Sequence, residues 1–283
     1  MRLRAVVLAL AGVLFVGACS QTGAPTAPLG NAAAPSRSHP SSPSAFPTEL
    51  TIAAAASLSK ALEKVSIAYQ SAHPGAGMTV STDSSATLET QIEQGAPVDV
   101  FLSADTTNPK KLVEGGFADG DAVVFAGNKL TIITPKDDPG GLTSPFDLAK
   151  AGVRIVAAGD DVPITRYATT LVEHLAAAPG APAGFAAAYD KNVVSKEDNV
   201  SAVRSKIELG EGDAAIVYVT DAAASDKVGT IEIPDALNVP ASYAGVVVKA
   251  SAQHAAAHAF LDWLRGPDGR SILDQFGFLP PAA

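Results

Sequence analysis

Four segments of the chain place small or hydrogen-bonding residues where helices are expected to begin. They are Ser57, Ser85, the turn 162–164 and the turn 198–200. A helix start has unpaired N–H groups and a partial positive charge of about half a unit, so it attracts an anion without any cationic side chain. A single serine in such a place is usually a cap, and Ser57 is expected to cap the helix that follows it. The four starts therefore indicate an anion site only if the fold brings them together.

Alternating strands and helices are the elements that must position these residues. Short apolar runs predict strands, and apolar residues at helical spacing predict helices between them. The strands are expected at 50–55, 78–81, 98–102, 129–133, 153–157, 214–219 and 245–248, and the helices after 57, after 85, near 109, from 160 to 175, from 200 to 210, from 255 to 264 and from 271 to 276. This alternation predicts an α/β fold with largely parallel sheets, in which helix starts gather at the carboxyl ends of the strands.

The N-terminal segments indicate export and a membrane tether. Residues 1–18 have a basic start, a short apolar run and small residues before Cys19, which is the layout of a secretory signal. Val-Gly-Ala-Cys at 16–19 resembles the bacterial lipobox, in which the cysteine receives a lipid. Residues 19–48 are rich in Pro, Ser and Ala and cannot bury a core. We expect an exported protein, anchored by a lipid on Cys19 to the outer face of the cell membrane.

Composition separates this chain from several functional classes. Of its 283 residues, 47% are hydrophobic and 17% are charged, which predicts a folded body with a sizeable core. Twenty basic residues face 29 acidic ones, a net charge of −9, and removal of 1–18 leaves 18 against 29, or −11. This balance argues against nucleic acid as a partner. The single cysteine excludes a disulfide framework and a thiolate metal cluster.

A serine hydrolase is the best enzymatic alternative. Ser57 and Lys60 fit the S-x-x-K pattern of penicillin-recognising enzymes, with the serine as nucleophile. The other two motifs of those enzymes, Ser-Asp-Asn and Lys-Thr-Gly, do not occur in the chain. Hydrolysis therefore ranks below binding.

Two further alternatives rest on charged side chains. His254, His258 and Asp262 follow one another at i, i+4 and i+8, a spacing seen in zinc sites, although a solvated helix face is the preferred interpretation. Arg166 follows one of the proposed helix starts and could read a carboxylate, but a surface position is preferred for it.

Several ordered motifs resemble the periplasmic molybdate-binding proteins. The similarity spans nearly all of 50–279. Its motifs are Ala-Ala-Ala-Ser-Leu at 54–58, Ser-Ser-Ala-Thr-Leu at 84–88, the run from Gly95 to Asp105, Val-Pro at 162–163, Ile-Val-Tyr-Val-Thr-Asp-Ala at 216–222, Leu-Arg-Gly-Pro at 264–267 and Gln-Phe-Gly-Phe at 275–278.

The resemblance implies a two-lobed periplasmic-binding-protein fold of type II, with two mixed sheets flanked by helices and a ligand cleft between the lobes. Lobe 1 is expected from 49–127 and 245–283, and lobe 2 from 128–244. The implied function is capture of molybdate, and of tungstate with similar size and charge, for delivery to the permease of a membrane ABC importer. Neither catalysis nor a cofactor is implied, and the protein is expected to be a monomer.

The same resemblance assigns the ligand-binding residues. The family's two serine hydroxyls match Ser57 and Ser85, its two main-chain N–H groups match Ile164 and Val200, and its tyrosine hydroxyl matches Tyr218. Pro163 is followed by Ile164 and Thr165 where the family has a small residue and glycine. A backbone donor is expected to tolerate that change, since its N–H is unaltered.

The chemistry of these five groups is consistent with binding of a tetrahedral dianion. A deprotonated tetraoxoanion only accepts hydrogen bonds, and all five groups donate. A protonated phosphate would leave its own proton unpaired in such a site, and sulfate is smaller than molybdate. Both remain as alternative ligands. Asp83, beside the serine pair, is the exception, because an inward carboxylate would repel a dianion.

Overall fold

A five-stranded mixed sheet forms the core of the first lobe in the computed structural model, which describes residues 48–281. Its strands are β1 (Thr48–Ala55), β2 (Ala76–Asp83), β3 (Val100–Ser103), β4 (Val123–Asn128) and β10 (Ala241–Val247), in the order β2-β1-β3-β10-β4. β1 runs parallel to β2 and β3, whereas β10 is antiparallel to β3 and β4. The expected signal segment, Cys19 and all but the last residue of the 19–48 tether lie outside the described residues.

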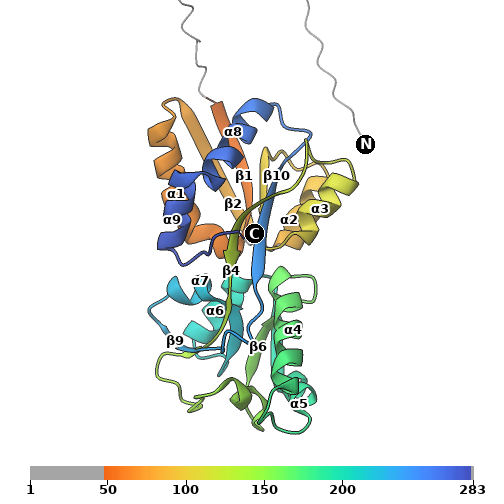
Figure 1. Ribbon diagram of the computed structural model, residues 1–283, viewed down its shortest axis with the longest axis vertical. Coiled ribbons are helices and arrows are strands. Elements are labelled where there is room, and N and C mark those ends of the chain that lie inside the picture. The colour runs from red at the N-terminus through yellow and green to blue at the C-terminus, as the bar shows by residue number, and fades with distance from the viewer. Residues whose placement is uncertain (1–47, 282–283) are drawn as a thin grey trace, which may run out of the picture. The chain divides into compact units, whose positions relative to one another are not determined.

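Helices cover both faces of this sheet. They are α1 (Ser59–Ala72), preceded by the short 3-10 turn η1 (Ala56–Leu58), with α8 (His254–Arg265) and α9 (Pro267–Gln275) on one face and α2 (Ser85–Glu93) and α3 (Thr107–Glu114) on the other. Side chains alternate along the strands, so Val100 and Leu102 join one core cluster and Phe101 joins the other. Figure 1 shows the two helix layers on either side of the strands.

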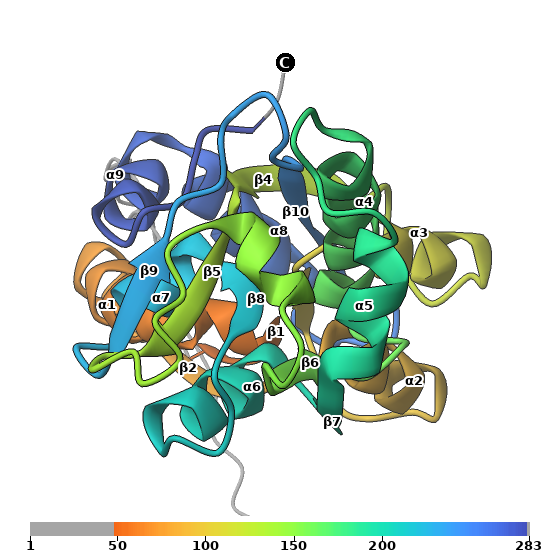
Figure 2. The same cartoon turned by 90° about the horizontal axis from the view of Figure 1, so that it is seen from below.

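The second lobe contains two smaller sheets. Their strands are β5 (Leu130–Pro135), β8 (Ala215–Tyr218) and β9 (Val228–Ile231) in the order β8-β5-β9, and β6 (Ile155–Ala158) paired with β7 (Val193–Glu197). The helices are α4 (Pro163–Ala177), α5 (Phe185–Asn192), α6 (Val200–Glu208) and α7 (Val219–Ala223), with a second 3-10 turn η2 (Pro145–Ala149). Figure 2 shows α4 and α5 on one side of these strands and α6 and α7 on the other.

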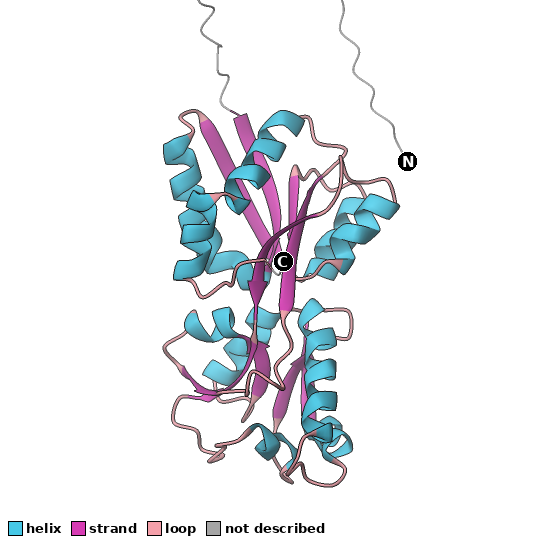
Figure 3. Ribbon diagram, viewed as in Figure 1, coloured by secondary structure: helices cyan, strands magenta, loops and turns pink. Residues whose placement is uncertain are grey.

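The connections between the lobes explain why the sheets are mixed. β1 and β3 both end at the edge of the sheet that faces the second lobe (Figure 3). β10 enters from the second lobe, so it starts at that edge and runs the opposite way. In the same manner β5 begins two residues after β4 ends and lies antiparallel to β8. The chain therefore passes between the lobes twice, at β4–β5 and before β10.

The structure corrects several expectations from the sequence. The alternation predicted largely parallel sheets, whereas the five-stranded sheet is mixed, as the resemblance implied, and the β8-β5-β9 sheet is antiparallel, because β10 and β5 each arrive from the opposite lobe. Three strands and two helices were not predicted: β4, β7, β9, α5 and α7. The strand expected at 245–248 already starts at Ala241, so residue 245 lies inside β10. Among the described residues, no helix has the length and apolar character needed to cross a membrane.

Candidate functional site

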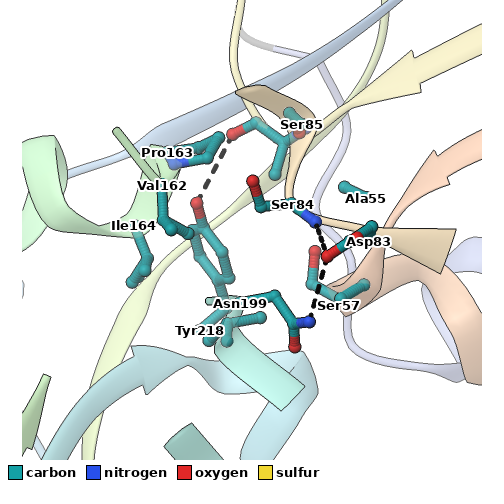
Figure 4. A pocket seen from close by; sticks show the side chains of 13 residues that line it. Ala55, Ser57, Asp83, Ser84, Ser85, Val162, Pro163, Ile164, Asn199 and Tyr218 are labelled. Atoms are coloured by element: carbon teal, nitrogen blue, oxygen red, sulfur yellow. Dashed lines mark hydrogen bonds between the residues drawn. The ribbon is translucent and has the colours of Figure 1, made fainter. Parts of the chain in front are cut away.

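One pocket between the lobes is lined by all five residues assigned from the sequence. Residues from the first lobe form one side of the pocket, and residues from the second lobe form the other (Figure 4). Its lining residues are Ala55, Ala56, Ser57, Asp83, Ser84, Ser85, Ala104, Val162, Pro163, Ile164, Asn199, Val200 and Tyr218. The volume open to the centre of a water-sized sphere is ≈ 10 Å³, about what a single small group needs and far below that of sites for organic ligands. The pocket suits a small ion.

Ser85 presents its hydroxyl hydrogen to the pocket. It is the first residue of α2 and is 1% exposed. Its Oγ accepts the N–H of Ala104 at 3.0 Å, a contact between the start of α2 and the end of β3. Because a hydroxyl oxygen that accepts from one side still has its own proton to donate, Ser85 acts as a fixed donor. The cap of α2 is its neighbour Ser84, whose Oγ accepts the N–H of Thr87.

Ser57 is held in a similar way by a residue that sequence reasoning missed. Its Oγ lies 2.9 Å from the hydroxyl of Tyr243 on β10. That hydroxyl also accepts a hydrogen bond from Asn128 Nδ2 at 3.3 Å, so it can give its own proton to Ser57 and leave the Ser57 hydrogen for a ligand. Ser57 is therefore not the N-cap expected from the sequence: Leu58 takes that position, and α1 has no side-chain cap.

Tyr243 and Asn128 lie where the chain crosses between the lobes. Besides contacting Tyr243, Asn128 Nδ2 donates to Thr220 Oγ1 at 2.9 Å in the second lobe. Burial raises the pKa of the Tyr243 phenol well above its ordinary value, so it stays protonated. No local motif signals this role, because 128 and 243 are distant in sequence and meet only through the pairing of β4 with β10.

Two residues at helix starts of the second lobe line the same pocket. Val200 is the first residue of α6, and Ile164 is the second residue of α4, after Pro163. First-turn N–H groups have no acceptor within their own helix, and the helix dipole adds positive potential there. The side chains of both residues are buried, 2% exposed for Ile164 and 4% for Val200, so they hold the backbone in place. Asn199 caps α6 by accepting the N–H of Ala202 at 3.0 Å.

Tyr218 supplies a phenol from the end of β8. It is 1% exposed, and its hydroxyl lies 3.5 Å from the carbonyl oxygen of Ala104 across the cleft. Its ring contacts Tyr167 and Tyr243 edge-on. Burial, with smaller contributions from the neighbouring phenols and Asp221, raises the pKa of Tyr218 well above its ordinary value. The group is therefore a donor at every physiological pH.

Asp83 also lines the pocket, at the end of β2. Its Oδ1 accepts the N–H of Ser84 at 2.7 Å and Nδ2 of Asn199 at 3.2 Å. The carboxylate thus joins the two lobes at the rim of the pocket, and two donors partly offset its charge. It is the only ionisable carboxylate among the lining residues.

No lysine or arginine is among the residues that line this pocket. Arg166, on α4, pairs instead with Asp105 of the first lobe. The interpretation of Arg166 as a reader of an organic carboxylate in this pocket is therefore wrong. Every group that faces the pocket apart from Asp83 is neutral, and the polar ones are hydroxyls or amides.

The hydrolase alternative lacks its catalytic pair. Lys60 Nζ pairs with Glu63 at 3.1 Å and is half-exposed, while Ser57 contacts Tyr243. A lysine that activates a serine must reach its hydroxyl. The S-x-x-K match is thus a coincidence of sequence.

The three residues of the proposed zinc site do not converge on one point either. His254 Nδ1 and His258 Nε2 lie 2.6 and 3.0 Å from the same oxygen, Oδ2 of Asp119, whereas Asp262 pairs with Arg265. Within residues 48–281 no group of three or more His, Cys, Asp or Glu side chains is arranged to hold a metal ion. His254 and His258 on α8 thus share Asp119 of the preceding α3–β4 connection, and Asp262 forms a separate pair with Arg265.

Comparisons with known proteins agree with this architecture. The family model of the bacterial extracellular solute-binding proteins matches residues 50–279. A Mycobacterium tuberculosis protein called molybdate-binding protein ModA is 34% identical over 245 residues, which cover 86% of this chain and 89% of that protein. A Bacillus subtilis protein called putative ABC transporter substrate-binding lipoprotein YvgL is 31% identical over 231 residues, or 81% and 85% of the two chains.

A solved structure also superposes on the described chain. The periplasmic molybdate-binding protein of Azotobacter vinelandii gives a TM-score of 0.71 with 27% identity, and the match covers 82% of this chain and all of that one. The similarity extends over both lobes and thus includes the elements that build the pocket.

Proposed function

This chain belongs to the bacterial extracellular solute-binding protein family, and on that premise we propose that its pocket captures molybdate and delivers it to an ABC importer in the membrane. The protein binds its substrate and does not transform it, as its relatives are substrate-binding components rather than enzymes. The observation that carries the proposal is the lining of the pocket: hydroxyl and main-chain donors from both lobes, with no cation among them.

The donor set favours a fully deprotonated tetraoxoanion. Molybdate at neutral pH only accepts hydrogen bonds, and Ser57, Ser85, Tyr218 and the N–H groups of Ile164 and Val200 only need to donate. The Oδ1 atom of Asp83, the one carboxylate oxygen with assigned partners, is already used by two donors. Among the lining residues only Asp83 offers a carboxylate acceptor for the proton of a hydrogen phosphate, and because its Oδ1 already has two donors, we expect hydrogen phosphate to bind more weakly than molybdate.

Binding of tungstate and of sulfate tests the size of the pocket. Tungstate has nearly the same size and charge as molybdate, so we propose that it binds with similar affinity. Sulfate is smaller, and the same donors could not all reach its oxygens at good distance. The expected order is molybdate and tungstate first, then sulfate and phosphate.

Export and anchoring complete the proposal. A solute-binding protein for an importer must work outside the membrane, and the signal layout of 1–18 with Cys19 supplies a route and a lipid attachment site. The lipoprotein name of the B. subtilis relative supports this part. Mass spectrometry of the mature N-terminus, with or without a diacylglyceryl group on Cys19, decides it.

Calorimetry on the Ser85→Ala variant tests the site. The variant loses one donor to a buried anion, so molybdate binding should weaken by about 1–3 kcal/mol, or about 5- to 150-fold. Ser271→Ala, on the exposed face of α9, is the matched control and should bind as the wild type does.

The same titrations, run with the four oxyanions on the wild-type protein, test the ligand. Binding of sulfate or phosphate in preference to molybdate would overturn the assignment. So would an unchanged molybdate affinity in Ser85→Ala, since Ser85 would then lie outside the binding site.

A further inference from the structure

A charged pair joins the two lobes beside the pocket without lining it. Arg166 lies two residues after Ile164 on α4, and its Nη2 contacts Oδ2 of Asp105 in the first lobe. The carboxylate is buried, with its side chain 3% exposed, whereas the arginine side chain is 47% exposed. Neither residue is among those that line the oxyanion pocket.

Asp105 is fixed in advance by residues of its own lobe. Oδ1 accepts the hydroxyl of Ser103 and the N–H of Asn108, each at 2.9 Å, and Oδ2 accepts Nδ2 of Asn108 at 2.9 Å. Asp105 directly follows Ala104, whose N–H holds Ser85 and whose carbonyl oxygen lies near the Tyr218 hydroxyl. The carboxylate is therefore a preformed receptor for a cation at the edge of the site.

Each of the other contacts between the lobes near the pocket includes at least one uncharged group. Ser201 Oγ donates to the carbonyl oxygen of Ala56 at 3.3 Å, Tyr218 reaches Ala104 at 3.5 Å, and Asn199 donates to Asp83 at 3.2 Å. Within residues 48–281, Arg166–Asp105 is the one ion pair between the lobes. A charge-assisted bond with one buried partner is stronger than a neutral one.

We propose that the Arg166–Asp105 ion pair is a latch that stabilises the closed lobes, so that oxyanion affinity depends on two positioning residues that do not touch the ligand. Opening the lobes separates the pair. Asp105 then keeps its three donors from the first lobe, and Arg166 is taken up by water. A bound ion escapes only when the lobes part, so the latch acts mainly on the dissociation rate. This inference rests on the proposed function.

If Arg166 instead attracts the oxyanion directly, the substitution Asp105→Asn should have the opposite effect on affinity. If the guanidinium acted by direct attraction to the oxyanion, removing the charge of Asp105 would expose more of that attraction and tighten binding. If the pair is a latch, removing either charge loosens closure and weakens binding. The sign of the Asp105→Asn effect therefore separates the two roles.

Four variants make the test: Arg166→Gln, Asp105→Asn, the double variant, and Arg154→Gln as a control. Arg154 is 48% exposed and pairs with Asp213, but both lie within the second lobe. Asparagine at 105 keeps an acceptor for the N–H of Asn108, and the melting temperature of each variant checks its fold. Molybdate affinity and dissociation rate are measured by calorimetry and stopped flow.

Each single variant at 105 or 166 should weaken binding about 3- to 30-fold, a range reduced from that of a buried charged bond because Arg166 is half-exposed. This loss of affinity should appear as a faster dissociation rate. The double variant should bind molybdate no more weakly than either single variant. Arg154→Gln should leave affinity unchanged. Tighter binding in Asp105→Asn, additive losses in the double variant, or an unchanged Arg166→Gln would overturn the latch.

Small-angle X-ray scattering of the ligand-free proteins gives a readout that does not depend on the ligand. Arg166→Gln and Asp105→Asn should show a larger radius of gyration than the wild type and Arg154→Gln, because their lobes are open more often. An equal radius in all four proteins would overturn the latch even if molybdate binds. A failure of the wild type to bind molybdate, with the radius still larger in the two latch variants, would instead overturn the proposed function alone.

Discussion

At the scale of single residues, the site depends on which way each hydrogen points. Ser57 and Ser85 each have a partner behind them, Tyr243 for one and the Ala104 N–H for the other. A serine fixed in this way loses less entropy when an anion binds, because its rotamer and proton position are already set. These two donors carry no charge, and contacts within the protein already orient both of them.

Asp221 is the buried group with the largest consequence for pH dependence. It lies on α7, is 1% exposed, and has one oxygen, Oδ2, without a hydrogen-bond partner within the described residues. Burial raises its pKa to about 7, opposed by Arg204 and by the N–H of Tyr218. The flanking strands β5 and β9, residues 130–135 and 228–231, contain no ionisable side chain that could assist. The native protein therefore holds a proton that the unfolded chain releases near pH 4.

The free energy of unfolding should consequently fall as the pH rises from about 4 to about 7, because the folded state binds more protons in that window. Above about pH 7 the free energy of unfolding should stay lower by a constant amount, roughly 4 kcal/mol for a shift of about three pKa units. Asp221→Asn removes this component. Urea unfolding at pH 5 and pH 8 should show a smaller decrease for the variant than for the wild type, and equal decreases would contradict the raised pKa.

Of the residues that line the pocket, the sequence identified five in advance, although no single motif among them is diagnostic. The five residues that it assigned lie around one pocket: Ser57, Ser85, Ile164, Val200 and Tyr218. Tyr243 and Asn128 could not be predicted, since their contact depends on strand pairing over more than a hundred residues.

At the scale of elements, α6 links the site to the second lobe. Its cap, Asn199, accepts the N–H of Ala202 and donates to Asp83 in the first lobe, while the next residue, Val200, presents its N–H to the pocket. One side chain thus fixes the helix start, the main-chain donor and a contact between lobes.

Asn199→Ala should therefore affect both stability and binding. Loss of the cap costs about 0.5–2 kcal/mol of stability, as measured by urea unfolding. Molybdate affinity should fall as well, because the Val200 N–H is less well held and the Asp83 contact is lost. Asn199→Asp restores the cap but places a second carboxylate beside Asp83, so it should recover stability and bind worse than the wild type. Recovery of both would contradict this account.

The elements that the sequence predicted are those with a clear apolar pattern. Continuous apolar runs identify β1 and β3, which are buried on both faces for most of their length, and helical spacing identifies α1 and α4, which each bury one face. β4 was missed although residues 123–126 form a short apolar run, and Val124 in that run is exposed in the fold. The alternation of strands and helices wrongly favoured parallel strands, whereas the family resemblance correctly implied mixed sheets: the return of β10 from the second lobe is a property of the whole topology and leaves no mark on the strand itself.

At the scale of the whole molecule, an acidic protein is proposed to bind a dianion. The net charge is −9. A wider hollow beside the pocket is lined by five acidic and two basic side chains: Asp83, Glu89, Asp160, Asp161 and Asp198, with Lys111 and Arg166. Both basic groups have acidic partners, since Lys111 contacts Glu89 and Arg166 contacts Asp105. Local dipoles therefore bind the ion, whereas the long-range field of the protein opposes its approach.

The association rate constant for molybdate should accordingly rise with salt. Between 10 and 200 mM NaCl the Debye length falls from about 30 Å to below 10 Å, which screens the repulsion while leaving the short hydrogen bonds of the pocket intact. Stopped-flow measurements should show an increase of about 2- to 10-fold. The double variant Asp161→Asn, Asp198→Asn, at the hollow, should associate faster at low salt and respond less to added salt. The control is Asp226→Asn, Asp235→Asn, which changes the net charge equally at positions outside the hollow and should respond much as the wild type does. A rate that falls with salt would mean that a positive field guides the ion, against the charge distribution described here.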